Sequence, residues 1–245
     1  MKVLVIGETC VDKFVYCKSN RLSPEAPIPV INPIKTITND GMAGNTVANI
    51  RALFPESIIA GIHQKQNILK TRYVEEKSNH MFIRVDEGEE FEDKFKWNAF
   101  TDTSIGQADI VIVSDYNKGF LSDLDLMEIA KKSPLSILDS KRKLTNDIIK
   151  DFTFVKLNEL ERNNNSDLIT SNIITTLGKK GALYNGEIYE SPNPQDTIDV
   201  SGAGDTFTAA FIGKFYHSLE ESVAIRFANQ KSSEVVSKRG VVTPI

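Results

Sequence analysis

The run "DVSGAGDTFTAAF", residues 199–211, places groups that could hold an anion beside a group that could accept a proton. Gly202 and Gly204 flank Ala203, and glycine permits the backbone angles at which successive N–H groups converge on one anion. The helical pattern that begins here adds unpaired N–H donors and a positive dipole end. Asp205 could deprotonate an attacking hydroxyl, although capping the helix is the competing interpretation. The run therefore predicts phosphoryl transfer, with Asp205 as general base and residues 202–204 as the anion hole.

The elements expected around this run alternate between strand and helix. Six short apolar runs are nearly continuous, as in strands that are covered on both faces. These runs are residues 2–7, 57–62, 109–114, 135–140, 152–157 and 172–177. The helical patterns include residues 44–54, 121–132, 203–216 and 218–236, whereas residues 161–168 are expected to be a polar connector. The alternation predicts an α/β fold with a largely parallel sheet.

Two segments interrupt this alternation. Residues 13–40 carry several prolines, which confine strand pairing to edges or bulges. Residues 69–97 contain two strand-like stretches around a turn at residues 77–80. We expect these segments to form a small β-lid. The core would then consist of residues 1–12, 41–68 and 98–245.

The composition limits the kind of partner. The 245 residues include 29 basic and 33 acidic side chains, a net charge of −4, which argues against nucleic acid held by bulk charge. Cys10 and Cys17 are too few for a disulfide scaffold and lack the neighbours of a zinc site, so we expect reduced thiols. No apolar stretch approaches the roughly 20 residues that span a bilayer, and no signal peptide is evident. We therefore predict a cytoplasmic protein with no nucleic-acid or membrane partner.

The run at residues 199–211 closely resembles the C-terminal signature of the ribokinase-like (PfkB) carbohydrate kinases. Further motifs resemble those of the family and occur in its order. They are Asp12 after the first strand, "DGMAGNTVANI" (40–50), "KLNELE" (156–161), "TTLGKKG" (175–181) and the C-terminal residues 227–245. The resemblance implies a ribokinase-like three-layer α/β/α sandwich with a mainly parallel central sheet and a small β-sheet lid. It also implies ATP-dependent phosphorylation of a sugar hydroxyl.

The resemblance implies roles for individual residues. Those expected to bind the sugar are Asp12, Gly41, Gly44, Asn45 and Asn49. Those expected on the nucleotide side are Asn158, Thr176, Gly178, Gly181 and Asn229. Asn158 and Glu161 are expected to organise Mg²⁺ through water, and a K⁺ site is expected near Asp199 and residues 238–243. Because family lids often pair, a homodimer through the β-lid is also implied.

Four segments are similar, more narrowly, to the kinase half of the bifunctional heptose 7-phosphate kinase/heptose 1-phosphate adenylyltransferases. They are residues 21–30 ("RLSPEAPIPV"), 71–89, 113–121 and 138–141. This similarity implies that the acceptor is the anomeric hydroxyl of D-glycero-D-manno-heptose 7-phosphate. Cations must then meet the sugar's own phosphate, and the candidates are Arg21, Lys118, Lys141 and Arg72. Each of them could equally be a solvated surface charge, and for Arg72 this second interpretation is preferred.

The chain departs from the family pattern at several points. It is short after residues 57–62, where the family has a further helix and strand. Met42 stands where a second glycine is usual, Ser140 where the heptose kinases have proline, and Glu8 where aspartate is usual. Two alternatives therefore stay open, a kinase for another sugar or sugar phosphate and a degenerate member that binds ligand without catalysis. Intact Asp205 argues against the second.

Overall fold

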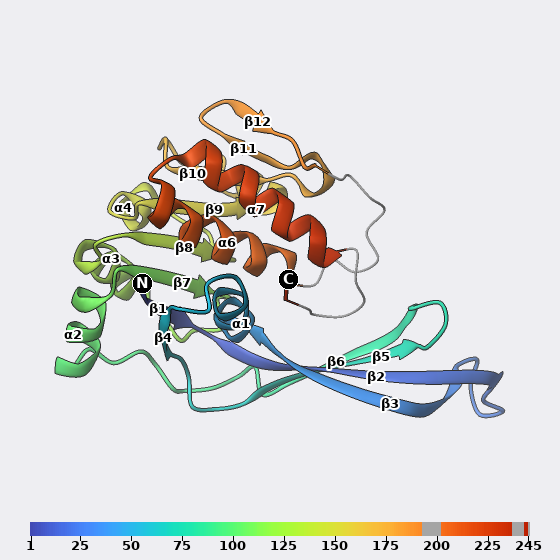
Figure 1. Cartoon of the computed structure of the whole chain (residues 1–245). Coiled ribbons are helices and arrows are strands. Elements are labelled where there is room, and N and C mark those ends of the chain that lie inside the picture. The colour runs from blue at the N-terminus through green and yellow to red at the C-terminus, as the bar shows by residue number, and fades with distance from the viewer. Residues whose placement is uncertain (193–201, 237–242, 245) are drawn as a thin grey trace.

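The main sheet has eight strands in the order β12-β11-β10-β9-β8-β7-β1-β4 (Figure 1). The computed structural model describes residues 1–192, 202–236 and 243–244. The strands are β1 (Lys2–Gly7), β4 (Ile58–Ile62), β7 (Ile110–Asp115), β8 (Ser136–Ser140), β9 (Phe154–Asn158), β10 (Ile173–Thr176), β11 (Ala182–Tyr184) and β12 (Glu187–Tyr189). The six predicted strands are confirmed, and they pair in parallel. β11 and β12, which were not predicted, add an antiparallel hairpin at one edge.

Helices cover both faces of this sheet (Figure 1). They are α1 (Ala43–Leu53), α2 (Ala99–Gln107), α3 (Asp123–Lys132), α4 (Asn146–Ile149), α5 (Glu159–Asn164), α6 (Ala203–Ser218) and α7 (Glu221–Val236), with a short 3₁₀ turn at Gly178–Lys180. The capping box expected at Ser122 and Asp125 opens α3, with reciprocal hydrogen bonds between the two residues. The predicted α/β fold with a mainly parallel sheet is confirmed. Within the described ranges, no helix has the length and apolarity needed to cross a bilayer.

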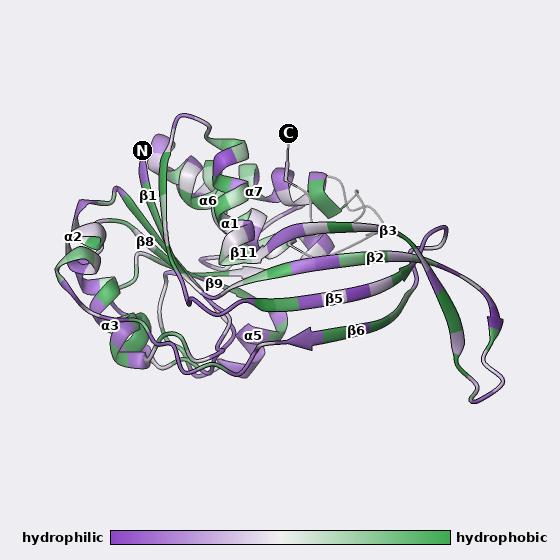
Figure 2. Cartoon of the chain, turned by 90° about the horizontal axis from the view of Figure 1, so that it is seen from below, coloured by the Kyte–Doolittle hydropathy of each residue, from purple (hydrophilic) through white to green (hydrophobic). Residues whose placement is uncertain are grey.

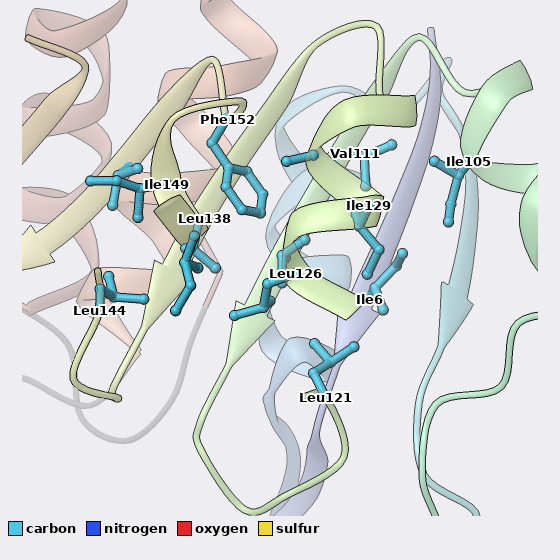
Figure 3. Close-up of a cluster of buried hydrophobic side chains, with 14 of the residues drawn as sticks. Ile6, Ile105, Val111, Leu121, Leu126, Ile129, Leu138, Leu144, Ile149 and Phe152 are labelled. Atoms are coloured by element: carbon cyan, nitrogen blue, oxygen red, sulfur yellow. The ribbon is translucent and has the colours of Figure 1, made fainter. Parts of the chain in front are cut away.

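The strands alternate their side chains between two hydrophobic layers. Val3 and Val5 of β1 pack with α1, α6 and α7, whereas Leu4 and Ile6 pack with α2, α3 and α4. Figure 3 shows the second layer, where Leu126 and Ile129 of α3 lie against the sheet. Because both faces are buried, the strands read as continuous apolar runs in the sequence.

The connector predicted at residues 161–168 is partly wrong, because α5 continues to Asn164. Asn158 caps this helix: its Oδ1 accepts the N–H of Glu161 at 2.8 Å, and its own N–H donates to Glu161 Oε2 at 2.7 Å. Asn158-x-x-Glu161 is thus a capping box, and this signal outweighs the low helix propensity of the asparagines that follow.

A second, four-stranded sheet projects from the main body (Figures 1 and 2). Its order is β3-β2-β5-β6, and its strands are β2 (Thr9–Leu22), β3 (Pro29–Met42), β5 (Ile68–Glu75) and β6 (Met81–Glu87). We call these strands the lid sheet. The predicted turn at residues 77–80 joins β5 to β6, and the proline-rich run lies at the far end of the β2–β3 hairpin. Phe95 is buried in the main body, so the lid sheet ends before residue 97. The division into core and lid units stays a prediction.

Candidate active site

The carboxyl ends of the parallel strands meet at one edge of the main sheet, beside the base of the lid sheet. β7 leads there into Tyr116, β8 into Lys141 and β9 into Asn158. The N-terminus of α6 reaches the same edge with Gly202, Ala203, Gly204 and Asp205. In open α/β sheets, ligands bind outside this edge. A cavity of about 470 Å³ opens here, and its wall includes Asp205, Gly202, Gly204, Tyr116, Asp139, Lys141, Lys156, Asn158, Glu159, Leu160, Thr176, Leu177 and Gly178.

Asp205 is held from both sides within this cavity. Asn45 Nδ2 donates to Asp205 Oδ2 at 2.8 Å, and Tyr116 Oη donates to Asp205 Oδ1 at 2.8 Å. Burial raises the pKa of Asp205 to about 6, and the charge of Asp139 acts in the same direction. The two hydrogen bonds oppose this rise because they favour the ionised form. A carboxylate with a pKa this close to neutrality suits a general base.

Asn45 is held in turn by Asn49, which is itself hydrogen-bonded to α6. Asn49, one turn along α1, donates from Nδ2 to Asn45 O at 2.8 Å and to Asn45 Oδ1 at 3.1 Å. Thr206 Oγ1 donates to Asn49 Oδ1 at 2.8 Å. Because Thr206 directly follows Asp205, this hydrogen bond links Asn49 to the segment that carries Asp205. Asn49 is fully buried, so in this structure it orients Asn45 rather than facing the cavity.

A buried ion pair lies beside the N-terminus of α6. Lys156 is only 2% exposed, and its ammonium donates to Asp139 Oδ2 at 3.0 Å. Thr208 donates to the same oxygen. Burial would raise the pKa of Asp139, but the ammonium groups of Lys156 and Lys141 outweigh burial and hold it below its ordinary value. A methyl group on Gly204 would lie 2.9 Å from Lys156 Nζ, so this cation lies directly against the predicted anion hole.

The sequence prediction missed this pair, although a signal was present. Asp139 and Lys156 each interrupt an apolar strand, and β8 and β9 are neighbours in register, with Asp139 opposite Lys156. A charge inside a buried strand is rarely without a partner. Two opposite charges on consecutive buried strands therefore indicate a pair.

Asp12 lies where β2 leaves the main body. Arg72 of β5 donates to Asp12 Oδ1, and its guanidinium lies 5.1 Å from the centre of the Phe14 ring. The side chain of Arg72 is 14% exposed, so the expectation of a solvated charge is wrong. Gly41 of β3 lies opposite Cys10, and a methyl group on Gly41 would overlap the Asp12 carboxylate and the Cys10 sulfur. Glycine at this position is therefore needed to admit the carboxylate.

Met42 has a backbone that explains the family's preference for glycine. Its φ is 56° and its ψ is −133°, in a region that side chains disfavour. The side chain is nevertheless buried against Cys10 and Ile68, which compensates for the backbone cost. Cys10 and Cys17 are free thiols, as predicted, and both are buried, which raises the pKa of the Cys10 thiol to about 12.

The comparison with protein families identifies the family of the chain. Residues 59–245 match the family model described as pfkB family carbohydrate kinase. The chain belongs to this family. It is therefore a carbohydrate kinase.

Relatives of this pfkB-family kinase include bifunctional proteins named HldE. The chain is 28% identical to that of a Nitratiruptor species over 296 residues, covering 99% of the chain and 63% of the relative. It is also 28% identical to that of Helicobacter pylori over 300 residues, covering 98% of the chain and 63% of the relative. The chain thus spans less than two thirds of the length of the curated relatives it matches.

Solved structures share the fold of the pfkB-family kinase at low identity. Arabidopsis thaliana ribokinase, complexed with ribose and ATP, has a TM-score of 0.75 at 16% identity, covering 99% of this chain and 95% of that chain. Phosphofructokinase-2 from Escherichia coli, in complex with potassium, has a TM-score of 0.74 at 14% identity, covering 98% and 93%. These likenesses confirm the predicted ribokinase-like fold.

In the pfkB-family kinase, most of the predicted site residues lie at the carboxyl-terminal edge of the main sheet, but some do not. Arg21 is exposed near the far end of β2, close to the β2–β3 turn. Asn229 lies in α7, where its Nδ2 donates to Tyr189 O at 2.7 Å. Gly181 has a φ of 99° and makes a close backbone contact with Tyr189. Apart from Thr243, the K⁺ site expected near Asp199 and residues 238–243 lies outside the described residues.

Three further predicted residues lie around the lid base and the cavity. Gly44, in α1, borders a separate cavity of about 400 Å³ behind the lid base. Lys118 donates to Glu89 Oε2 at 2.6 Å, at the junction of lid and core. Lys141 pairs with Glu161, and its ammonium lies 5.6 Å from the centre of the Tyr116 ring.

The donor atoms beside Lys141 are of the type that Mg²⁺ prefers in kinases. Asn158 and Glu161 supply amide and carboxylate oxygens, and magnesium usually needs only one or two carboxylates plus substrate phosphates. Within the described part of the chain, Asp139 Oδ1 is buried and has no hydrogen-bond partner, with Lys141 Nζ 4.0 Å away. An unsatisfied carboxylate oxygen facing this cavity fits a cationic ligand.

Proposed function

We propose that the protein transfers the γ-phosphoryl group of ATP to a sugar hydroxyl, and that the acceptor is the anomeric hydroxyl of D-glycero-D-manno-heptose 7-phosphate. The observation that carries the proposal is the position of Asp205. Its buried carboxylate lies at the N-terminus of the 16-residue helix α6 and faces the cavity at the sheet edge. A proton acceptor and an anion-binding helix end are thereby joined in one turn of chain.

The chemistry follows from this arrangement. Asp205 accepts the proton of the acceptor hydroxyl while the oxygen of that hydroxyl attacks the γ-phosphorus of ATP. The bond from that phosphorus to the β,γ-bridging oxygen breaks, and ADP leaves with the electron pair. The N–H groups of Gly202, Ala203 and Gly204, with the Lys156 ammonium close behind them, stabilise the charge on the transferred group. Mg²⁺, held through water by Asn158 and Glu161, would offset the charge of the nucleotide phosphates.

The preference for a phosphorylated sugar is supported by cations at the base of the lid sheet. Lys70 and Arg72 follow each other at alternate positions of β5, so both side chains point to the same face as Asp12 of the paired strand β2. Lys118 approaches this face from the core, and Glu89 binds both Lys70, at 2.9 Å, and Lys118. A phosphate ester on the sugar could replace that carboxylate between the two ammonium groups. The HldE relatives support the heptose assignment.

The test is ADP release in a coupled assay with a panel of acceptors. We expect magnesium-dependent turnover with heptose 7-phosphate, and much slower turnover with ribose and fructose 6-phosphate. Turnover with one of the other acceptors alone would support a kinase for a different sugar. Nucleotide binding without turnover on any acceptor would contradict the proposed activity and support the degenerate, ligand-binding alternative.

The raised pKa of Asp205 predicts an acid limit to activity. Only the ionised carboxylate can accept a proton, so kcat/KM should fall as the pH drops through about 6, the pKa of Asp205. Between pH 7 and pH 5 we expect a loss of about tenfold. A sugar phosphate also ionises near pH 6. ¹³C NMR titration of the aspartate carboxyls must therefore show whether the acid limb of the kcat/KM profile belongs to Asp205 or to the substrate. An Asp205 carboxyl that titrates near pH 4 would contradict the prediction.

We propose that two copies associate through the lid sheet. β6 is an edge strand, where Ile83 and Val85, at alternate positions, are exposed and apolar on one face, and Met81 is exposed at its start, beyond a bulge. An exposed apolar edge favours pairing. Sedimentation should give twice the mass of one chain, and Ile83→Asp should give monomers. Ile188→Asp, on the exposed edge strand β12, is the matched control and should leave the dimer intact. A wild-type monomer at micromolar concentration would contradict the dimer.

A further inference from the structure

Tyr116 is the second residue bound to the carboxylate of Asp205, and no sequence motif assigned it a role. It follows β7, lines the cavity, and donates its hydroxyl to Asp205 Oδ1 at 2.8 Å. Asn45 occupies the other oxygen at the same distance. The plane of the carboxylate is therefore fixed by two donors from different elements, the loop after β7 and helix α1.

The loop that carries Tyr116 is itself fixed by a buried anion. Glu8 is fully buried at the end of β1, and its carboxylate accepts the N–H groups of Tyr116 at 2.9 Å, Lys118 at 3.0 Å and Phe120 at 3.2 Å. Asn117 and Gly119, at φ values of 56° and 93°, alternate with these donors. This alternation lets the N–H groups of every second residue converge on one anion. The protein's own carboxylate thus fills the nest and sets the position of Tyr116.

We propose that Tyr116 is a positioning residue of the kinase reaction, whose hydroxyl orients Asp205 and stabilises its ionised form while the acceptor hydroxyl binds. The inference rests on the proposed role of Asp205 as the base. Each carboxylate oxygen has two lone-pair sites, so the hydrogen bonds from Tyr116 and Asn45 leave a site on each oxygen for the substrate proton.

Tyr116 does not relay that proton. Burial, together with the charge of Asp205, raises the pKa of Tyr116 well above its ordinary value, so the phenol keeps its own proton throughout. The proton of the acceptor hydroxyl goes to Asp205 directly. Loss of the phenol hydroxyl should therefore change the charge state of Asp205 at a given pH rather than abolish proton transfer.

The test compares Tyr116→Phe with Tyr184→Phe, a second buried tyrosine on β11 at the other end of the sheet. Without the donated hydrogen bond the carboxylate is less stable, so the acid limb of kcat/KM should move to higher pH by about one unit. At pH 8 the loss of activity should stay below about tenfold, because Asp205 is ionised there in both enzymes. Tyr184→Phe should leave the limb in place. The substrate phosphate ionises at the same pH in assays of every variant, so it cannot cause a difference between their acid limbs.

A measurement without turnover separates this inference from the proposed activity. In protein labelled with ¹³C at the aspartate carboxyls, the Asp205 signal is the one absent from Asp205→Asn. Its midpoint should rise by about one pH unit in Tyr116→Phe, whether or not any sugar is phosphorylated. An unchanged midpoint, or an unchanged acid limb in an active enzyme, would overturn the positioning role. Absence of turnover with a shifted midpoint would contradict only the activity.

Discussion

Asp205→Asn is expected to lower kcat by about two to four orders of magnitude, the range in which a general base contributes. Asparagine has nearly the same shape and can still accept the hydrogen bond from Tyr116. It cannot accept the proton of the acceptor hydroxyl. Because the proposed role of Asp205 concerns the acceptor hydroxyl and not the binding of ATP, the KM for ATP should change by less than about threefold.

The control for this substitution is Asp147→Asn, an exposed aspartate in α4 whose partner is Lys150. It should match the wild type in rate and in melting temperature. Steady-state kinetics and nucleotide titration of both variants check the expectation. Wild-type kcat in Asp205→Asn would remove Asp205 from the role of base, and a raised KM at constant kcat would assign it to binding instead.

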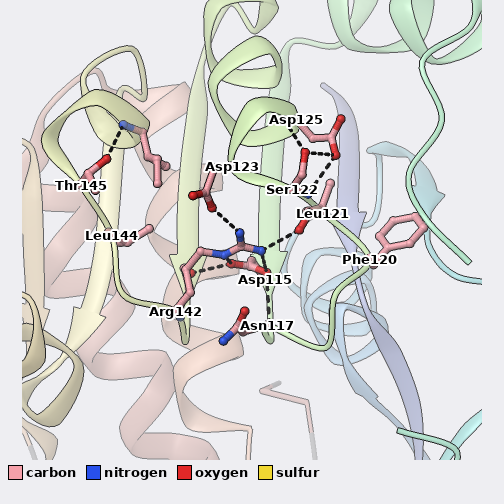
Figure 4. A network of polar contacts seen from close by, with 12 residues as sticks. Asp115, Asn117, Phe120, Leu121, Ser122, Asp123, Asp125, Arg142, Leu144 and Thr145 are labelled. Carbon is pink, nitrogen blue, oxygen red and sulfur yellow. Dashed lines mark hydrogen bonds and ion pairs between the residues drawn. The ribbon is translucent and has the colours of Figure 1, made fainter. Parts of the chain in front are cut away.

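Arg142→Ala is expected to destabilise the fold by about 3–5 kcal/mol, the cost of leaving a buried charge without its partner. Figure 4 shows the reason: the guanidinium binds both oxygens of Asp115, at 2.6 and 2.9 Å, and also Asp123 and the carbonyl of Leu121. Asp115 is fully buried. At about 2–4 °C per kcal/mol, the melting temperature should fall by roughly 6–20 °C.

The effect should extend to activity, because Asp115 ends β7 directly before Tyr116, and Arg142 directly follows Lys141 after the end of β8. Arg84→Ala is the matched control: Arg84 pairs with Asp86 on the lid sheet, but its side chain is 50% exposed. Exposed pairs contribute about 1 kcal/mol or less. Calorimetry should give a much lower melting temperature for Arg142→Ala than for Arg84→Ala. Equal melting temperatures of the two variants would mean that Asp115 is not held as a buried charge.

Much of the fold could be predicted because burial on both faces leaves a direct trace in the sequence. The runs that became β1 and β7 are nearly continuously apolar, since one residue packs under α3 and the next under α6. The β11–β12 hairpin was missed because its strands have only three residues each, too short for a pattern. Helix α5 was missed although Asn158-x-x-Glu161 carries a capping signal, because both residues were assigned to binding magnesium and nucleotide.

The candidate site was predictable where its residues share one segment. Gly202, Gly204 and Asp205 lie within four positions, so local geometry alone brings them together. The partners of Asp205 come from α1 and from the loop after β7, 160 and 89 positions away. Asn45 was found through a family motif, whereas Tyr116 depends on the order of strands in the sheet. Arg72 was misjudged because its partner Asp12 lies on a neighbouring strand of the lid sheet, whose pairing the sequence does not reveal.

The most direct test of the account is ³¹P NMR of the wild-type enzyme with equimolar ATP and heptose 7-phosphate in the presence of Mg²⁺. We predict that the γ-phosphate signal of ATP disappears and that a phosphate ester on the anomeric carbon appears in equal amount. Asp205→Asn, under the same conditions, should leave ATP intact over the same time. An unchanged γ-phosphate signal in the wild type, or its conversion to inorganic phosphate alone, would contradict transfer to the sugar.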